Sequence, residues 1–290
     1  MGASSHLNCL VDILQPERRT RILDVGANPI NDCPYGELRD AGLADVWGFE
    51  PQASAFEALQ KIKGENEHYL PHAIGDGSDA QLNVYRSSGF TSLLPINTAL
   101  LDYLGQWHRQ TRLVEQVSFQ TRRLDDIDEL PPPDLLKIDV QGAEAMIFRN
   151  GASKLSQSVA VVTEVSLVPL YVGQPLMHEQ ARILDDYGFL FHKFLFLKSV
   201  ALQSPLVEHV NRKRLESQVV DGDAVFIRSI LDPGSVSDEQ LKHLAICADS
   251  VFRSFDLVFK CLTLLMARGV LTEAAALDYA RLTPHGRTEG

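Results

Sequence analysis

Between residues 21 and 228, short runs rich in β-branched residues alternate with stretches of helical periodicity. This alternation is typical of a sheet covered by helices. Several runs are apolar throughout, as expected of parallel strands that are buried on both faces. The predicted strands are residues 21–25, 46–50, 82–85, 135–140, 159–164, 189–196 and 224–228. The predicted helices between them are residues 53–62, 143–150 and 177–187. The sequence therefore predicts an α/β fold.

The remaining segments predict a chain in three parts: an N-terminal helix in residues 1–20, a main domain in residues 21–232, and a helical extension in residues 233–290. Within the main domain, residues 89–117 are expected to be irregular and then helical, and residues 197–223 to be an insertion. Residues 237–240 (SDEQ) form a capping box that opens one predicted helix reaching residue 268, followed by a shorter helix at 272–282. The wide apolar stripe of the long helix is expected to pack on the main domain or on a second copy of the chain.

The composition excludes several classes of function. With 27 basic and 38 acidic residues the net charge is −11, which disfavours nucleic acid as the main partner. The four cysteines form no CxxC pair, and no apolar run approaches the length of a membrane span, so a reduced, cytoplasmic compartment is expected. The nine histidines show no metal-binding spacing, and no G-x-S-x-G motif occurs. We therefore assign no metal ligand.

Acidic and small residues follow the first two predicted strands. Asp24 and Gly26 end the first strand, where a glycine turn lets a ligand approach the backbone closely. Glu50 ends the second strand, where a carboxylate can accept hydrogen bonds from both hydroxyls of a ribose. A dinucleotide site would need the pattern G-x-G-x-x-G, whereas this chain has a single glycine and acidic surroundings. This arrangement favours a ligand that carries an ammonium and a sulfonium, as S-adenosylmethionine does.

Three blocks of the sequence resemble the FkbM family of S-adenosylmethionine-dependent methyltransferases. The blocks are residues 23–28 (LDVGAN), 48–51 (GFEP) and 136–144 (LKIDVQGAE). They follow the family's order and lie at the ends of predicted strands. The resemblance implies a class I methyltransferase, Rossmann-like three-layer fold with a seven-stranded, mostly parallel sheet whose antiparallel last strand is residues 224–228. It also implies methyl transfer from S-adenosylmethionine to a hydroxyl of a sugar, glycan or natural product.

The resemblance also implies how this chain would hold the cofactor. Asp24, Gly26 and Asn28 would line its methionine end, Glu50 would hold its ribose, and Asp76 would lie near its adenine. The chain departs from the family pattern at Ile30, where glycine is usual, and at Gln141, where glutamate is more common. The first departure stiffens the loop, and the second removes a charge near the substrate.

The third block is expected to carry the reaction. Asp139 follows an apolar strand and is the best candidate to accept a proton from the acceptor hydroxyl or to position it. Glu164 ends the next strand on the same rim, and we predict a role in the site for it. Glu144 begins a helix, where an acid is also favoured by the helix dipole. The sequence leaves open whether these three acids hold a divalent metal ion.

Two other classes of function remain open. A non-catalytic cofactor-binding or assembly protein is suggested by Ile30, by Gln141 and by the apolar C-terminal helix. An NAD-dependent oxidoreductase is disfavoured by the missing glycines. The expected partner is a small-molecule or glycan acceptor, with a homo-oligomer through the C-terminal helix as a further possibility.

Overall fold

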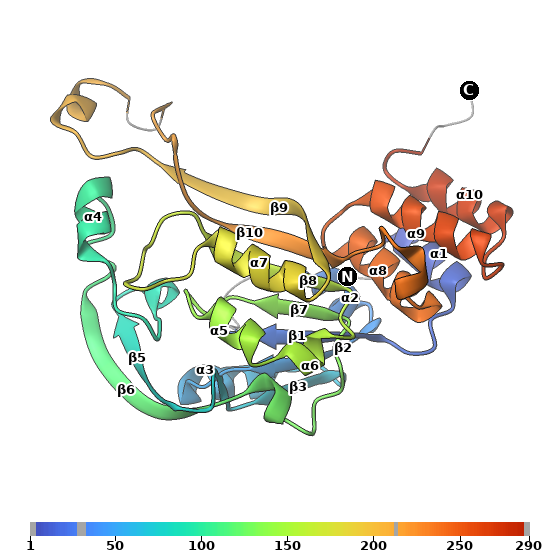
Figure 1. Ribbon diagram of the computed structural model, residues 1–290, viewed down its shortest axis with the longest axis horizontal. Coiled ribbons are helices and arrows are strands. Elements are labelled where there is room, and N and C mark those ends of the chain that lie inside the picture. Colours follow the sequence, from blue (N-terminus) through green and yellow to red (C-terminus); the bar gives the residue numbers. More distant parts are fainter. Residues whose placement is uncertain (1–3, 28–32, 212–213, 287–290) are drawn as a thin grey trace.

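The computed structural model describes residues 4–27, 33–211 and 214–286, which form a seven-stranded main sheet (Figure 1). In spatial order its strands are β3 (Glu67–Leu70), β2 (Ala44–Phe49), β1 (Thr20–Val25), β7 (Leu135–Ile138), β8 (Ala160–Ser166), β10 (Gln218–Arg228) and β9 (Phe189–Val200). The first five are parallel, and β10 is antiparallel to both of its neighbours. This confirms the predicted class I methyltransferase fold, including the antiparallel last strand.

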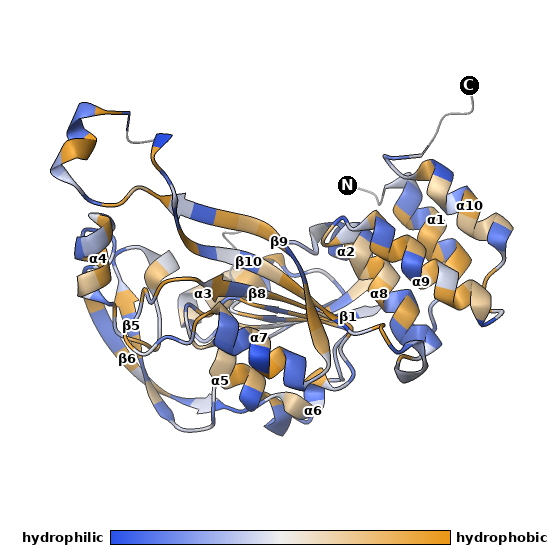
Figure 2. Cartoon of the chain, turned by 45° about the horizontal axis from the view of Figure 1, so that its top comes forward, coloured by the Kyte–Doolittle hydropathy of each residue, from blue (hydrophilic) through white to orange (hydrophobic). Residues whose placement is uncertain are grey.

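Helices cover both faces of this sheet because successive side chains of a strand point to opposite faces. In β1, Leu23 and Val25 point to a core shared with α5 (Glu144–Arg149), α6 (Ala152–Leu155) and α7 (Met177–Asp186). Ile22 points to the opposite core, shared with α1 (Ser5–Leu14), α8 (Asp238–Ser250) and α9 (Phe255–Ala267). Figure 2 shows the apolar strands between these helices, whose apolar sides face inward. The result is the three-layer arrangement predicted from the sequence.

A second, smaller sheet lies beside the carboxyl ends of the parallel strands (Figure 1). This sheet has the order β4 (Ala73–Ile74), β6 (Leu113–Arg122) and β5 (Asp79–Tyr85). Helix α4 (Thr98–Leu104) and the end of the long β9–β10 hairpin lie on the same side of the molecule, at the left of Figure 1. The other helices are α2 (Gly36–Asp40), α3 (Ala53–Ile62) and α10 (Glu273–Leu282), with short 3-10 turns η1 (Ser88–Phe90), η2 (Leu124–Asp126), η3 (Pro205–His209) and η5 (Pro233–Ser235).

Two expectations about the outer strands were wrong, and one strand was not predicted. Residues 82–85 lie in β5 of the second sheet, whereas the edge of the main sheet is β3, whose polar sequence EHYL gave no strand signal. Residues 89–117 were expected to end as a helix, but their helical part is only α4. From Leu113 the chain forms strand β6, which pairs with β5. The alternation of apolar and polar residues along a strand does not reveal which sheet the strand joins, because strand pairing depends on contacts that are distant in sequence.

The predicted single helix from Ser237 to Arg268 is also wrong, because the chain breaks between α8 and α9. Arg253 adopts a positive φ of 50° in the break, and the backbone N–H of Ser254 bonds back to the carbonyl of Ala248. The apolar periodicity continues through the break, with Phe252 and Phe255 both buried, so the pattern conceals it. The capping box at Ser237 is present as predicted.

The C-terminal helices pack on the main sheet, which is the first of the two arrangements that the sequence predicted. Asp249 on α8 is fully buried; its Oδ2 atom accepts a hydrogen bond of 2.7 Å from the hydroxyl of Tyr279 on α10 and lies 2.9 Å from Nδ1 of His6 on α1. This carboxylate therefore joins three helices. The division of the chain at residue 232 and the possible homo-oligomer stay predictions. In the described part of the chain, no helix has the length and apolar character needed to cross a membrane.

Candidate active site

The carboxyl ends of β1 and β7 meet at Gly26 and Asp139. The N–H of Asp139 donates to the carbonyl of Val25 over 3.1 Å, which extends the pairing of the two strands by one residue. Gly26 has a φ of 87°, and a Cβ at this position would collide with the carbonyl oxygen of Asp139. Glycine is therefore required where the two strand ends pass each other, as the predicted glycine turn implies.

A cavity of about 200 Å³ opens on one side of this crossing and contains Glu50. Glu50 follows β2, is 5% exposed, and accepts a hydrogen bond of 2.7 Å from the backbone N–H of Gln52. Burial raises the pKa of Glu50 to about 7, and the negative charge of Asp24 adds to this shift. Phe49 and Ile74 supply apolar walls. We call this space the Glu50 cavity.

A second cavity, of about 390 Å³, opens on the other side of the crossing and contains Glu164. Gly26 and Asp139 line this cavity as well as the Glu50 cavity, so the two spaces meet at these residues. Its other polar lining residues include Lys137 and Asp223, from β7 and β10. We call it the Glu164 cavity.

Asp24 is held by two neighbours. Its Oδ2 atom accepts a hydrogen bond of 2.6 Å from the hydroxyl of Tyr35, and its Oδ1 atom lies 3.1 Å from Nζ of Lys137. Burial alone would lower the pKa of the Lys137 ammonium, but the negative charge of Asp24 and Asp139 outweighs burial and raises it. Asp24 lines the Glu164 cavity, beside the crossing.

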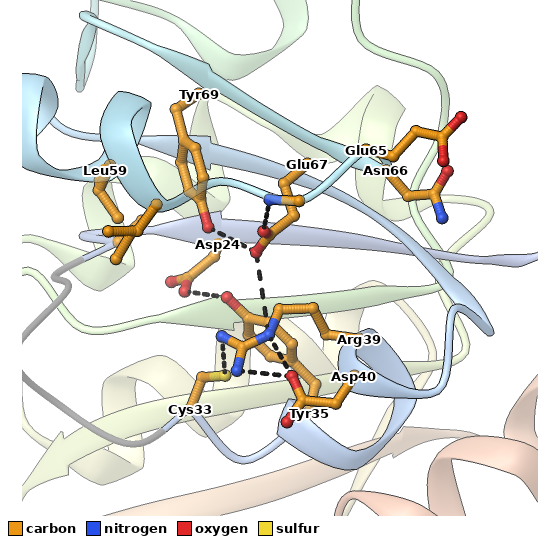
Figure 3. Close-up of a pocket in the computed structure, with 13 residues that line it drawn as sticks. Asp24, Cys33, Tyr35, Arg39, Asp40, Leu59, Glu65, Asn66, Glu67 and Tyr69 are labelled. Atoms are coloured by element: carbon orange, nitrogen blue, oxygen red, sulfur yellow. Dashed lines mark hydrogen bonds and ion pairs between the residues drawn. The ribbon is translucent and has the colours of Figure 1, made fainter. Parts of the chain in front are cut away.

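Figure 3 shows a further cavity, of about 440 Å³, on the other side of Asp24. Its polar side chains mostly bind one another: Tyr69 donates to Oε1 of Glu67 over 2.9 Å, and Arg39 lies 3.9 Å from the same oxygen. Burial and the charge of Glu67 raise the pKa of Tyr69. We assign this cavity no role.

Gln141 connects the two predicted catalytic acids. Its Nε2 atom lies 2.9 Å from Oδ1 of Asp139 and 2.9 Å from Oε2 of Glu164, and it donates to both. Burial, together with the charge of Asp139 and Glu144, raises the pKa of Glu164 well above its ordinary value. The structure therefore brings Asp139 and Glu164 together, and it does so through a residue that the sequence marked as a departure.

The structure does not test two of the predicted cofactor residues, Asp76 and Asn28. Asp76 lies in an exposed turn, where its Oδ1 atom accepts hydrogen bonds from the N–H and hydroxyl of Ser78, and it is not among the residues that line the Glu50 cavity. Its expected place near the adenine therefore stays a prediction. Asn28, like Ile30, lies outside the described residues.

Glu144 has a local structural role. Its carboxylate accepts hydrogen bonds from the backbone N–H groups of Val140 and Gly142, which fixes the turn after β7. Burial raises its pKa to about 7 against the effect of these hydrogen bonds. Glu144 is the first residue of α5, and the sequence allowed such a structural role for an acid at the start of a helix. Among the described residues, no three His, Cys, Asp or Glu side chains are grouped as metal ligands would be.

Comparison with known proteins identifies the family. Residues 24–191 match the model of the methyltransferase FkbM domain, which covers more than half of the chain. This chain belongs to the FkbM methyltransferase family. The match begins at Asp24 and includes Glu50, Asp139 and Glu164. The lining of the Glu50 cavity lies wholly within the matched residues, whereas Leu195 and Asp223 of the Glu164 cavity lie beyond them.

One relative of this chain is the 2-O-methyltransferase NoeI of Sinorhizobium fredii (strain NBRC 101917 / NGR234). It is 30% identical over 168 residues, covering 53% of this chain and 66% of NoeI, just under two thirds of that relative's length. Solved structures also align with this chain. The methyltransferase FkbM of Methylobacillus flagellatus KT has 14% identity and a TM-score of 0.38, covering 72% of this chain and 43% of its own. A magnesium protoporphyrin IX methyltransferase from Synechocystis PCC 6803 has 10% identity and a TM-score of 0.38, covering 77% and 80%.

Sequence reasoning assigned no role to Lys137, Asp223 or Tyr171. Lys137 is the one cation in the apolar strand LLKI, and Asp223 lies within the apolar second half of β10. A charged residue inside an apolar strand needs a partner, so both could have been flagged as site candidates. Tyr171, whose hydroxyl donates to Oε1 of Gln141, lies in a loop and carried no comparable signal.

Proposed function

We propose that this chain is an S-adenosylmethionine-dependent methyltransferase that methylates a hydroxyl of a sugar, a glycan or a small natural product. Membership of the FkbM family supports the methyl transfer. The relative named as a 2-O-methyltransferase supports oxygen as the methylated atom. The net charge of −11 argues against a nucleic acid as the acceptor.

The observation that carries the proposal is the shared position of Gly26 and Asp139 between two cavities. A methyltransferase needs one space for the nucleoside of its cofactor and another for the acceptor, with the reacting atoms where the spaces meet. Glu50 fits the first space, since a carboxylate there can accept hydrogen bonds from ribose hydroxyls. Gly26 fits as well, because its lack of a side chain keeps the crossing open.

Different residues of the chain have different roles in the reaction. When bound, S-adenosylmethionine supplies an electrophilic methyl group. Asp139 accepts a hydrogen bond from the acceptor hydroxyl and takes its proton as the oxygen attacks. Glu164 lies beside it and orients the acceptor from the neighbouring strand. Lys137 balances part of the negative charge that Asp24, Asp139 and Asp223 place around this space.

Calorimetry on the full chain tests the cofactor, with S-adenosylmethionine, S-adenosylhomocysteine and NAD as ligands. We expect both adenosyl compounds to bind and NAD not to bind; tight NAD binding alone would instead favour an oxidoreductase. Transfer of a labelled methyl group to a panel of free sugars and oligosaccharides tests the reaction. Binding without transfer to any of them would favour the non-catalytic alternative.

A further inference from the structure

Gln141 makes an unusual set of contacts for a residue beside a reaction site. One amide nitrogen, with two hydrogens, lies 2.9 Å from a carboxylate oxygen of Asp139 and 2.9 Å from one of Glu164. These distances suit one N–H···O bond to each carboxylate. Both hydrogens of the amide are therefore engaged, and the separation of the two carboxylates is fixed by a single nitrogen atom.

The glutamine is itself held from two directions. The hydroxyl of Ser92 donates to its backbone carbonyl over 2.6 Å. The hydroxyl of Tyr171 lies 3.1 Å from its side-chain oxygen and 3.0 Å from the carbonyl oxygen of Phe90, so its one hydrogen is shared between these two acceptors. Its φ is +57°, a left-handed conformation that is uncommon for a residue with a side chain, and Gly142 follows at +105°. A glutamine kept in such a backbone position by outside contacts indicates that its side chain is needed there.

Negative charge surrounds the bridge on several elements. Besides Asp139 after β7, Glu164 has Glu144 of α5 and Asp221 and Asp223 of β10 as acidic neighbours, with the phenol of Tyr171 on the loop side. An ionised glutamate at position 141 could not donate to either carboxylate. It would instead place a third acid between them, which favours uptake of a proton by the group.

We propose that Gln141 is a positioning residue, whose amide holds Asp139 and Glu164 side by side so that the two carboxylates meet the acceptor hydroxyl as one unit. The proposal rests on the proposed methyl transfer for its catalytic meaning. The arrangement of the three side chains does not depend on it.

Two variants separate this role from a structural one. Gln141→Asn keeps an amide but shortens the side chain by one carbon, so it cannot bridge both carboxylates. Asparagine also tolerates the left-handed backbone better than glutamine, so the fold should not suffer. Gln141→Glu keeps the length and removes the donor. Gln81→Glu, at an exposed position on β5, controls for the added negative charge.

The first measurement needs no acceptor. Carbon-13 NMR follows the Glu164 carboxyl through a pH titration, with the signal assigned by its loss in Glu164→Gln. We expect Gln141→Glu to raise the apparent pKa of Glu164 by about one pH unit or more and Gln141→Asn to raise it measurably, with no change in Gln81→Glu. Titration curves that coincide in the wild type and both Gln141 variants would overturn the bridge.

The second measurement uses turnover with the acceptor found in the sugar panel. We expect Gln141→Asn to lower kcat at least tenfold, with an unchanged KM for S-adenosylmethionine and no fall in Tm. We expect the acid limb of the kcat profile in Gln141→Glu to move to higher pH. A kcat that is unchanged, or that falls only together with Tm, would overturn the positioning role. Failure of the wild type to methylate any acceptor would refute the proposed function, while the titration would still decide the arrangement.

Discussion

The ammonium of Lys137 lies 3.1 Å from the carboxylate of Asp24, on the neighbouring strand of the sheet. The side chains are 17% and 5% exposed, so the pair is largely shielded from water. Tyr35 occupies the second oxygen of Asp24. The acid that ends β1 is thus fixed in place before any ligand arrives, and its negative charge is shared with a cation that also faces Asp139.

The pair predicts a measurable coupling. Asp24→Asn should lower the free energy of unfolding by about 1–3 kcal/mol, because it leaves the Lys137 ammonium with less compensating charge. Lys137→Met should also destabilise, since it leaves Asp24 with Tyr35 alone. The double variant should be more stable than the sum of the two losses implies, by about 0.5–3 kcal/mol. Urea denaturation of the four proteins measures this, and strictly additive losses would mean that the pair contributes no interaction.

Glu50 predicts how cofactor binding depends on pH. Its pKa of about 7 means that it is mostly protonated at pH 6 and mostly ionised at pH 8. Ribose hydroxyls donate to the ionised form, so binding should favour the carboxylate, and affinity should rise by about tenfold over this range. Calorimetry with S-adenosylhomocysteine at pH 6, 7 and 8 measures the rise.

Glu50→Gln is the matched control, because it keeps the shape and removes the titration. Its affinity should be low at all three pH values, so any pH dependence left in this variant belongs to the ligand. Glu50→Ala should lose on the order of 1.5–3 kcal/mol of binding at pH 8. Equal affinity in the wild type and Glu50→Ala would show that Glu50 does not hold the ribose.

The main sheet could be predicted because its inner strands are apolar on both faces. β1, β7 and β8 each appear as a short, mostly apolar run that leads to an acid or a glycine turn, and helix α3 begins and ends where its periodicity indicated. Edge and outer strands such as β3 and β6 carry polar side chains, so their sequences do not separate them from loops or helices.

The site could be predicted in part, for the same reason. Gly26, Glu50 and Asp139 follow apolar strands, and the carboxyl ends of parallel strands meet at one edge. The bridge through Gln141 could not be predicted, because it depends on a positive φ at that residue and on Tyr171, thirty positions further along. For Asp76, an acid in a turn has the same sequence signature as an acid at a ligand, so its place near the adenine stays a prediction.

The buried carboxylate of Asp249 predicts a strong dependence on Tyr279. Tyr279→Phe removes the 2.7 Å hydrogen bond and should cost about 1–3 kcal/mol of stability. Tyr103→Phe, at a position that is 53% exposed, should cost little. Thermal unfolding of both variants tests whether this contact stabilises the helices, and an equal Tm for the two variants would refute that role.

Removal of residues 233–290 tests the same layer more severely. It takes away α8 to α10 and uncovers the face of the sheet that carries Ile22 and Leu135. The shortened chain should aggregate or bind a hydrophobic dye. A shortened chain that is equally stable and monomeric would contradict the packing seen here.

The last prediction concerns Asp139 and the chemical step. Asp139→Asn keeps the side-chain shape but removes the proton acceptor, so kcat should fall by about 10² to 10⁴ while affinity for S-adenosylmethionine changes little. Asp102→Asn is the control, because the Asp102 side chain is 76% exposed and lines neither cavity; its kcat and affinity should both match the wild type. A structural role for Asp139 would appear as a lower Tm, so unfolding is measured on the same samples. If Asp139→Asn turns over normally, the proton must leave through Glu164 or water, and Glu164→Gln should then show the loss in its place.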